Sequence, residues 1–171
     1  MGLRDRQRRD DASGVQRYQM REKLLSIGDD YWIEDESGDR AFKVDGKALR
    51  LRDTFVLEDA SGAEVAKIQE RKLRVRDSMN IERAAGNATV HKALIGIRDR
   101  FKIDVDGGDD LSAHGNLVDH EYTIERDGDK VAEVSKKWFR VRDTYGVEIA
   151  PGQDDALILA ITVCIDALTS D

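Results

Sequence analysis

The sequence contains one cysteine, one proline and no long apolar run near its N-terminus. A lone thiol, Cys164, cannot form an intrachain disulfide, which excludes a secreted disulfide-rich scaffold. A single proline excludes a proline-rich stalk or linker. The basic N-terminal stretch is not followed by an apolar segment, so it lacks the pattern of a signal peptide. These absences predict a cytoplasmic protein.

The chain also lacks the residue patterns that mark known reactions. No P-loop or dinucleotide fingerprint occurs, and no histidine lies near the turn serines Ser37 and Ser61. The acidic run at 104–110 lacks the final Glu of a calcium loop and predicts a hairpin turn. The histidines match no metal motif and are predicted to be loop residues: His91, His114 and His120. We therefore expect no catalytic residue, no metal and no cofactor, and a protein that is not an enzyme.

Positive charge is in the minority. The chain has 28 Lys and Arg against 35 Asp and Glu, a net charge of −7. Such a chain is a poor partner for nucleic acid, and only a segregated basic patch would attract an anionic ligand. The 171 residues suit one domain. We place that domain at 15–171, after a flexible polar arm at 1–14 that either frays or makes basic contacts.

An internal repeat is the clearest feature that is present. The stretch from Tyr31 to Phe55 aligns without a gap, at a period of 24 residues, on the stretch from Phe55 to Met79. A third copy runs from Ile124 to Tyr145, and a fainter fourth from Lys92 to Phe101. The turn sequences DESG, DASG and RDGD are typical of tight hairpins, so each copy predicts a strand, a turn and a strand.

The flanks of these turns alternate between apolar and polar residues. Leu49 and Leu51 alternate with arginines, and Phe139 and Val141 do the same. Alternation of period two predicts strands with one face in a core and the other in water. We count about twelve such strands between residues 17 and 149, which favours a closed antiparallel barrel without exposed edges.

The C-terminal segment differs from the rest. Ala156 to Ile165 is apolar on every side except for Thr162, and Asp154 or Asp155 is placed to cap a helix before it. A buried strand is the alternative. A helix of this length spans about 20 Å, too little for a bilayer core of about 30 Å. We therefore predict a hydrophobic helix inside the barrel and no transmembrane segment.

Long stretches of the chain resemble the LURP-one-related family, whose fold belongs with the tubby C-terminal domains. The resemblance rests on segments in the family's order: YQMREKLLSIGDDYWIEDESGDRAFKVDGKALRLRDTFVLED, AKIQERKLRVRDSMNIER, VAEVSKKWFRVRDTYGVEI and APGQDDALILAITVCIDAL. It implies a closed barrel around a central helix and no defined reaction. Tubby proteins bind phosphoinositides and the more distant scramblases act on phospholipids, so by analogy the fold implies lipid binding.

Repeated cations are the candidate binding feature. They occupy equivalent places in the three copies, and if their strands are neighbours they form a ridge that can bind phosphate or carboxylate. The alternative is a set of cross-strand ion pairs with the abundant acids. The candidate residues are Arg50, Arg52, Arg74, Arg76, Arg140, Arg142, Lys72, Lys136 and Lys137.

Three functions are compatible with this pattern. The first is a non-catalytic domain that binds anionic phospholipid head groups or a protein partner through a basic barrel face. The second is an enzyme or carrier for a small phosphorylated or anionic ligand at the barrel rim. The third is a scaffold that self-associates, and the oligomeric state is left open.

Overall fold

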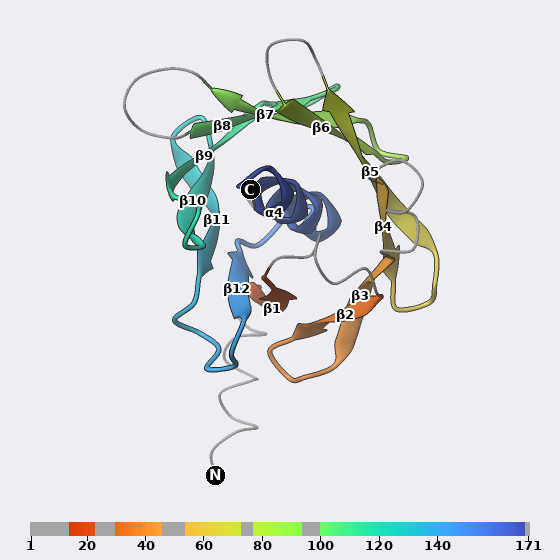
Figure 1. The fold of residues 1–171 in the computed structure, drawn as a ribbon, viewed down its shortest axis with the longest axis vertical. Helices are drawn as coiled ribbons and strands as arrows, with labels where there is room; N and C mark the ends of the chain where they lie inside the picture. The colour runs from red at the N-terminus through yellow and green to blue at the C-terminus, as the bar shows by residue number, and fades with distance from the viewer. Residues whose placement is uncertain (1–13, 23–29, 46–53, 73–76, 94–99, 170–171) are drawn as a thin grey trace.

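Twelve strands form a closed antiparallel barrel around one helix (Figure 1). The computed structural model describes residues 14–22, 30–45, 54–72, 77–93 and 100–169. Each strand pairs with its neighbours in sequence, and β1 closes the barrel against β12. The strands are β1 (Gln16–Arg21), β2 (Tyr31–Asp35), β3 (Arg40–Asp45), β4 (Thr54–Asp59), β5 (Glu64–Lys72), β6 (Asp77–Glu82), β7 (Ala88–Ala93), β8 (Arg100–Val105), β9 (Leu111–Asn116), β10 (Glu121–Arg126), β11 (Asp129–Ser135) and β12 (Thr144–Ile149). The predicted mainly β architecture is confirmed.

Alternation along the strands separates the core from the surface. In β8, Phe101 and Ile103 are buried while Lys102 and Asp104 are exposed. Ile33 and Leu57 fill the same interior from β2 and β4. Because side chains alternate between the two faces of a strand, a period-two sequence places one apolar row inside the barrel.

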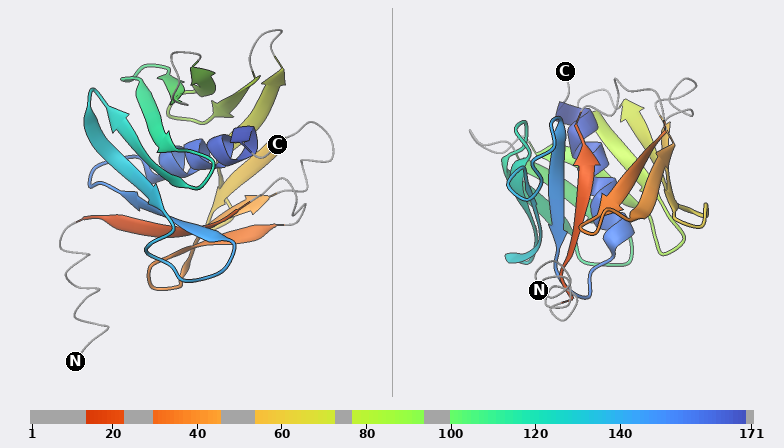
Figure 2. Two further views of the ribbon diagram at one scale, coloured as in Figure 1. Left: turned by 60° about the vertical axis from the view of Figure 1, so that its left-hand side comes forward. Right: turned by 90° about the horizontal axis from the view of Figure 1, so that it is seen from below.

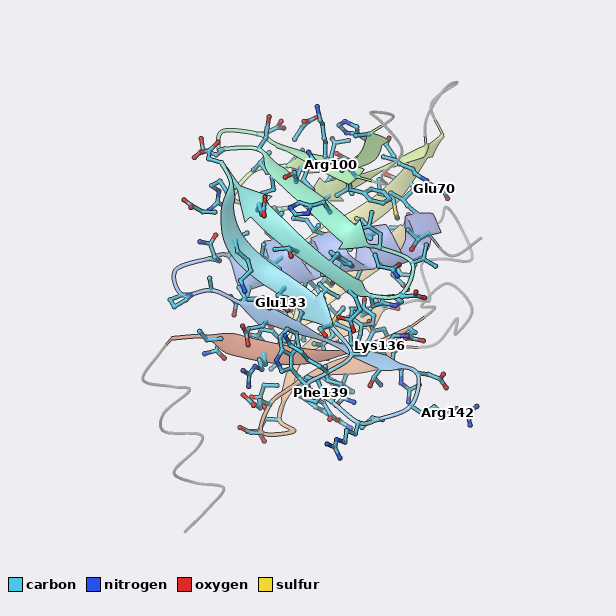
Figure 3. The ribbon with its side chains drawn as sticks, turned by 90° about the vertical axis from the view of Figure 1, so that its left-hand side faces the viewer. Glu70, Arg100, Glu133, Lys136, Phe139 and Arg142 are labelled. Carbon is cyan, nitrogen blue, oxygen red and sulfur yellow. The ribbon has the colours of Figure 1, made fainter. Side chains whose placement is uncertain are left out.

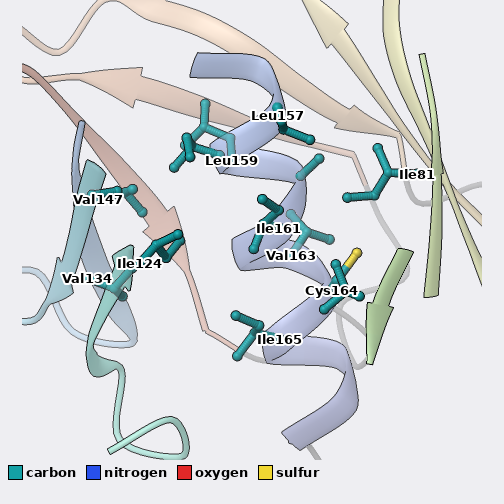
Figure 4. Close-up of a cluster of buried hydrophobic side chains, with 14 of the residues drawn as sticks. Ile81, Ile124, Val134, Val147, Leu157, Leu159, Ile161, Val163, Cys164 and Ile165 are labelled. Carbon is teal, nitrogen blue, oxygen red and sulfur yellow. The ribbon is translucent and has the colours of Figure 1, made fainter. Parts of the chain in front are cut away.

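The interior is filled by helix α4 (Asp155–Thr169). Every residue from Leu157 to Asp166 is buried, and strands surround the helix on all sides (Figures 1 and 4). A helix enclosed in this way must be apolar around its whole circumference, which explains the uniform sequence. The predicted central helix is confirmed, and Cys164 is a buried thiol on it. No helix among the described residues has the length and apolar character needed to cross a bilayer.

Polar contacts hold both ends of α4 to the barrel. At its start, Asp154 Oδ1 accepts a hydrogen bond of 3.2 Å from the Leu157 amide, as the predicted cap requires. Tyr18 Oη in β1 donates to Asp155 Oδ2 at 2.6 Å. Near its end, Asp166 lies 2.8 Å from His120 Nε2. The helix is therefore fixed by hydrogen bonds as well as by packing.

The repeated turns have the same local structure. Asp35 Oδ1 accepts hydrogen bonds from the amides of Ser37 and Asp39, and Asp59 Oδ1 accepts them from Ser61 and Ala63. A glycine with positive φ follows in each turn, at 84° and 89°. The predicted hairpins are thus confirmed for these two copies.

One predicted strand does not form. Residues 139–142 alternate like a strand, yet they belong to the connection 136–143 between β11 and β12. β11 already pairs with β10 on one side and β12 on the other, so no strand edge is left to bind this segment. The alternation there reflects contacts of individual side chains, which are described below.

The alternating direction of the strands sorts their connections into two rims. The connections that follow odd-numbered strands start and end at one rim, near the C-terminal end of α4 (Figure 2). Those that follow even-numbered strands start and end at the other rim, where α4 begins. The barrel therefore has two ends, each formed by a different set of connections.

Candidate functional site

The two rims carry opposite charge in the sequence. The six connections after odd-numbered strands contain eleven Lys and Arg against seven Asp and Glu. The six connections after even-numbered strands contain one Arg against seven Asp and Glu. We call the first the basic rim and the second the acidic rim. Seven of those eleven cations lie outside the described residues, and the four that are described all belong to residues 136–143.

At the basic rim, the longest fully described connection is 136–143, which we call the basic loop. Two aromatic residues anchor it. A Cβ built on Gly146 of β12 would lie 2.8 Å from Trp138 and 3.0 Å from Phe139, so both rings pack directly on this glycine. The Arg17 guanidinium and the Lys137 ammonium lie 5.6 and 4.9 Å from the Trp138 ring centre.

Polar contacts fix the two ends of the basic loop. The Lys136 amide donates to Glu121 Oε1 at 2.9 Å. At the far end, the Glu22 amide donates to the carbonyl of Asp143 at 2.9 Å, and Asp143 has a φ of 59°. Thr144 Oγ1 donates to the Val141 carbonyl at 2.7 Å. The loop is thus held in one conformation without being part of the sheet.

The lysines of the basic loop are neutralised locally. Lys136 Nζ lies 2.7 Å from Glu22 Oε1, and Lys137 Nζ lies 2.9 Å from Glu133 Oε1. The hydrogen bond to Glu22 raises the pKa of Lys136, and the hydrogen bond to Glu133 raises that of Lys137. These two predicted ligand-binding residues form ion pairs, but not the cross-strand pairs of the alternative expectation, because Lys137 pairs four residues away and Lys136 pairs with the residue after β1.

The arginines of the basic loop differ from the lysines. Arg140 and Arg142 are exposed, and the Arg142 side chain is 95% accessible with only Asp143 nearby, at 3.9 Å. Val141 between them is 56% exposed, one of two large apolar residues on the described surface that are exposed to this degree. Figure 3 shows Arg142 at the edge of the molecule, while Phe139 lies against the barrel. The tip thus presents two cations and an apolar side chain to solvent.

Other predicted site residues cannot be placed in the same way. Arg50, Arg52, Arg74 and Arg76 lie outside the described residues. Lys72 ends β5, and its side chain also lies outside the description. The strand ends that flank them, at Asp45, Thr54 and Asp77, belong to the basic rim. The described structure thus brings together only the four candidates of the basic loop.

A groove opens beside the basic loop. Strands β1 and β2 pair only at Tyr18↔Asp35 and Gln19↔Glu34, and beyond these pairs the two strands diverge. The space between them has a volume of about 810 Å³. Its walls come from β1, β2, the start of β3 and the end of the basic loop. The charged lining residues are Arg21, Glu22, Asp30, Glu34, Arg40, Arg142 and Asp143.

Two of the three histidines do not lie in loops as the sequence predicted. His91 and His114 lie in β7 and β9 rather than in loops. His120 is in a turn, but it is buried, stacked on Tyr145 with ring centres 4.2 Å apart, and bonded to Asp166. Its φ of 55° directs the side chain into the barrel. His120 is thus part of the interior, and no set of residues in the described structure is arranged to hold a metal ion.

The sequence analysis missed the residues of the groove. Arg21, Trp32 and Arg40 come from three strands and share no local pattern, so only the barrel geometry brings them together. Trp32 lies on the outer face of β2, and the Arg40 guanidinium lies over it, 4.9 Å from the centre of the Trp32 ring. An isolated tryptophan on the polar face of a strand was the available signal.

Comparisons with known proteins agree with this architecture. A solved structure of an Arabidopsis thaliana protein superposes with a TM-score of 0.67 at 19% identity, over 91% of each chain. At that identity the likeness shows the fold alone. No curated protein matches the chain. The model of the LURP-one-related family matches residues 16–166, from the first strand into helix α4, and the chain belongs to that family.

Proposed function

We propose that this domain is a non-catalytic, cytoplasmic binding module that docks on anionic phospholipid surfaces through its basic rim. The observation that carries the proposal is the tip of the basic loop, where Arg140, Val141 and Arg142 are exposed on a rigid support. Two arginines can bind phosphate oxygens, while a valine between them can enter the boundary between head groups and acyl chains. Each cation near an anionic leaflet contributes about 1 kcal/mol.

The acidic composition does not oppose this docking. The two rims are separated by the length of α4, whose 15 residues at about 1.5 Å each run about 22 Å. The Debye length at physiological ionic strength is about 8 Å, so charges on the acidic rim are screened from a surface at the basic rim. The local charge of the rim determines the attraction, and its contribution falls as salt rises.

Flotation with phosphatidylcholine vesicles of graded phosphatidylserine content, at low and moderate salt, tests the proposal. We expect salt-sensitive flotation that increases with phosphatidylserine. Replacing Arg140 and Arg142 with Gln should reduce the bound fraction severalfold. The matched control is Lys102→Gln with Lys130→Gln, which removes equal charge from an exposed strand position and from the start of β11 at the acidic rim.

Val141→Asp adds a test of the apolar contact. The substitution should weaken flotation even where phosphatidylserine is abundant, because a carboxylate at the tip faces the anionic surface. Absence of flotation at every lipid composition would overturn the proposal. If the bound fraction fell equally in the Arg140/Arg142 variant and in the control, the basic loop would have no specific part in docking.

A further inference from the structure

The groove between β1 and β2 is a second feature with binding chemistry, and it adjoins the tip of the basic loop, since Val141 and Arg142 belong to both. Its volume of about 810 Å³ is within the range of small-molecule sites. Met20, Tyr31 and Thr144 form buried parts of its wall. The two arginines that line the groove beside this wall, Arg21 and Arg40, are exposed to solvent.

Two arginines and one carboxylate remain in the groove once existing ion pairs are counted: Arg21, Arg40 and Glu34. The carboxylates of Glu22 and Asp30 are engaged by lysines outside the groove, with Lys136 Nζ at 2.7 Å and Lys43 Nζ at 3.3 Å. Neither Arg21 nor Arg40 has a carboxylate within ion-pair distance in the described part of the chain. The groove therefore offers guanidinium groups whose charge is not yet neutralised.

The Arg40 side chain is oriented by a stacking contact in a way that suits it to bind an anion. Its guanidinium stacks over Trp32 at 4.9 Å from the ring centre, and the stacked face leaves the N–H edge free. A planar guanidinium with a free edge can donate two parallel hydrogen bonds to a phosphate. The Trp32 ring thus restricts the position of the Arg40 side chain without neutralising its positive charge.

The remaining polar groups favour hydroxyl groups on the same ligand. Gln19 and Glu34 lie in the groove, and their side-chain oxygens can accept hydrogen bonds from hydroxyl groups. From the guanidinium groups and these acceptors together, we infer that the groove binds a small hydroxylated organic phosphate of the sugar-phosphate class. This inference goes beyond the proposed docking on lipid and does not depend on it.

Titration with glucose 6-phosphate, followed by amide and indole NMR signals, tests the inference. We expect saturable shifts of the Trp32 indole signal and smaller ones for Trp138. Glucose lacks the phosphate and inorganic phosphate lacks the hydroxyl groups, so each should bind at least tenfold more weakly. The Arg40→Gln and Arg21→Gln variants should each lose about tenfold in affinity, the effect of one charge-assisted hydrogen bond.

Separate variants distinguish this site from the lipid surface. Arg40→Gln should float with anionic vesicles like the parent protein, whereas Arg140→Gln should float less and still bind glucose 6-phosphate. Lys102→Gln is the charge-matched control, and an unchanged amide spectrum of each free variant confirms its fold. The inference is wrong if glucose 6-phosphate causes no saturable shift, or if Arg40→Gln binds it as well as the parent does.

Discussion

At the scale of single residues, His120 and Asp166 do the most to fix the central helix. Both side chains are buried, and the 2.8 Å contact joins α4 to the turn between β9 and β10. Glu22 Oε1 lies 3.7 Å from the other imidazole nitrogen and also pairs with Lys136 of the basic loop. A chain of polar contacts thus runs from the helix to the candidate binding surface.

His120→Ala should lower the free energy of unfolding by about 2–4 kcal/mol, because it removes the imidazole that satisfies a buried carboxylate. Urea denaturation measures the change. His114→Ala is the matched control, since His114 is 35% exposed and pairs with Glu125 at the surface. The His114→Ala variant should lose less than about 1 kcal/mol of unfolding free energy. Equal losses in the two variants would contradict the structural role of His120.

Asp59 offers a residue-scale test of turn chemistry. The hydroxyl of Ser61 donates to Asp59 Oδ1 at 2.6 Å, and with the Ala63 amide it lowers the pKa of that carboxyl. A pKa lowered by folding adds stability above the unfolded pKa, and this stability is lost as pH falls through the folded pKa.

Ser61→Ala should therefore raise the pKa of Asp59 toward its ordinary value. The pH range over which this carboxyl group loses its contribution to stability should become narrower. Carboxyl carbon NMR titration reads the value directly. Glu133, whose pKa is lowered chiefly by Lys137, is the internal reference and should not move. A pKa of Asp59 that is unchanged in the variant would show that the backbone donors alone lower it.

At the scale of elements, hairpins were predictable because their signals are local. Alternation and the Asp-x-Ser-Gly turns define β2–β3 and β4–β5, and a uniformly apolar segment defines α4. The basic loop was mistaken for a strand because alternation does not reveal whether a partner edge is free. The groove could not be predicted, since Arg21 and Arg40 line it from different strands where the β1–β2 register is incomplete.

Gly146→Ala tests how the basic loop is anchored. The new Cβ would lie 2.8 Å from Trp138 Cε3 and 3.0 Å from Phe139 Cδ2, so the aromatic anchors must move. We expect a loss of about 1–3 kcal/mol in unfolding free energy, typical of overpacking, and a shift of the Trp138 indole NMR signal.

Gly108→Ala is the control for this substitution, because its Cβ would meet only Val105 at an ordinary 3.4 Å. It should change stability by less than about 0.5 kcal/mol. If Gly146→Ala were as mild as the control and left the Trp138 signal in place, the anchoring described for the basic loop would be incorrect.

At the scale of the whole molecule, the barrel separates charge along the axis of α4. A buried helix closes the interior, so binding surfaces are restricted to the rims and the outer wall. The acidic rim consists of short hairpin turns, including the acidic turn at 106–110, where Asp110 accepts a hydrogen bond from the Val105 amide. Orientation near a charged surface therefore follows from topology, because every connection after an odd-numbered strand starts and ends at the same rim.

The separation of charge between the two rims predicts which end of the protein contacts a membrane. Hydrogen exchange with and without phosphatidylserine vesicles should show slower exchange in the basic loop and at 117–120, both at the basic rim. The turns at 36–39, 60–63 and 106–110 should exchange as in free protein, because the acidic rim faces away from the lipid. Raising the salt should release the protection, since screening weakens the attraction. Protection of the acidic turns, or of both rims equally, would mean that the barrel does not bind by one end and that charge segregation does not orient it.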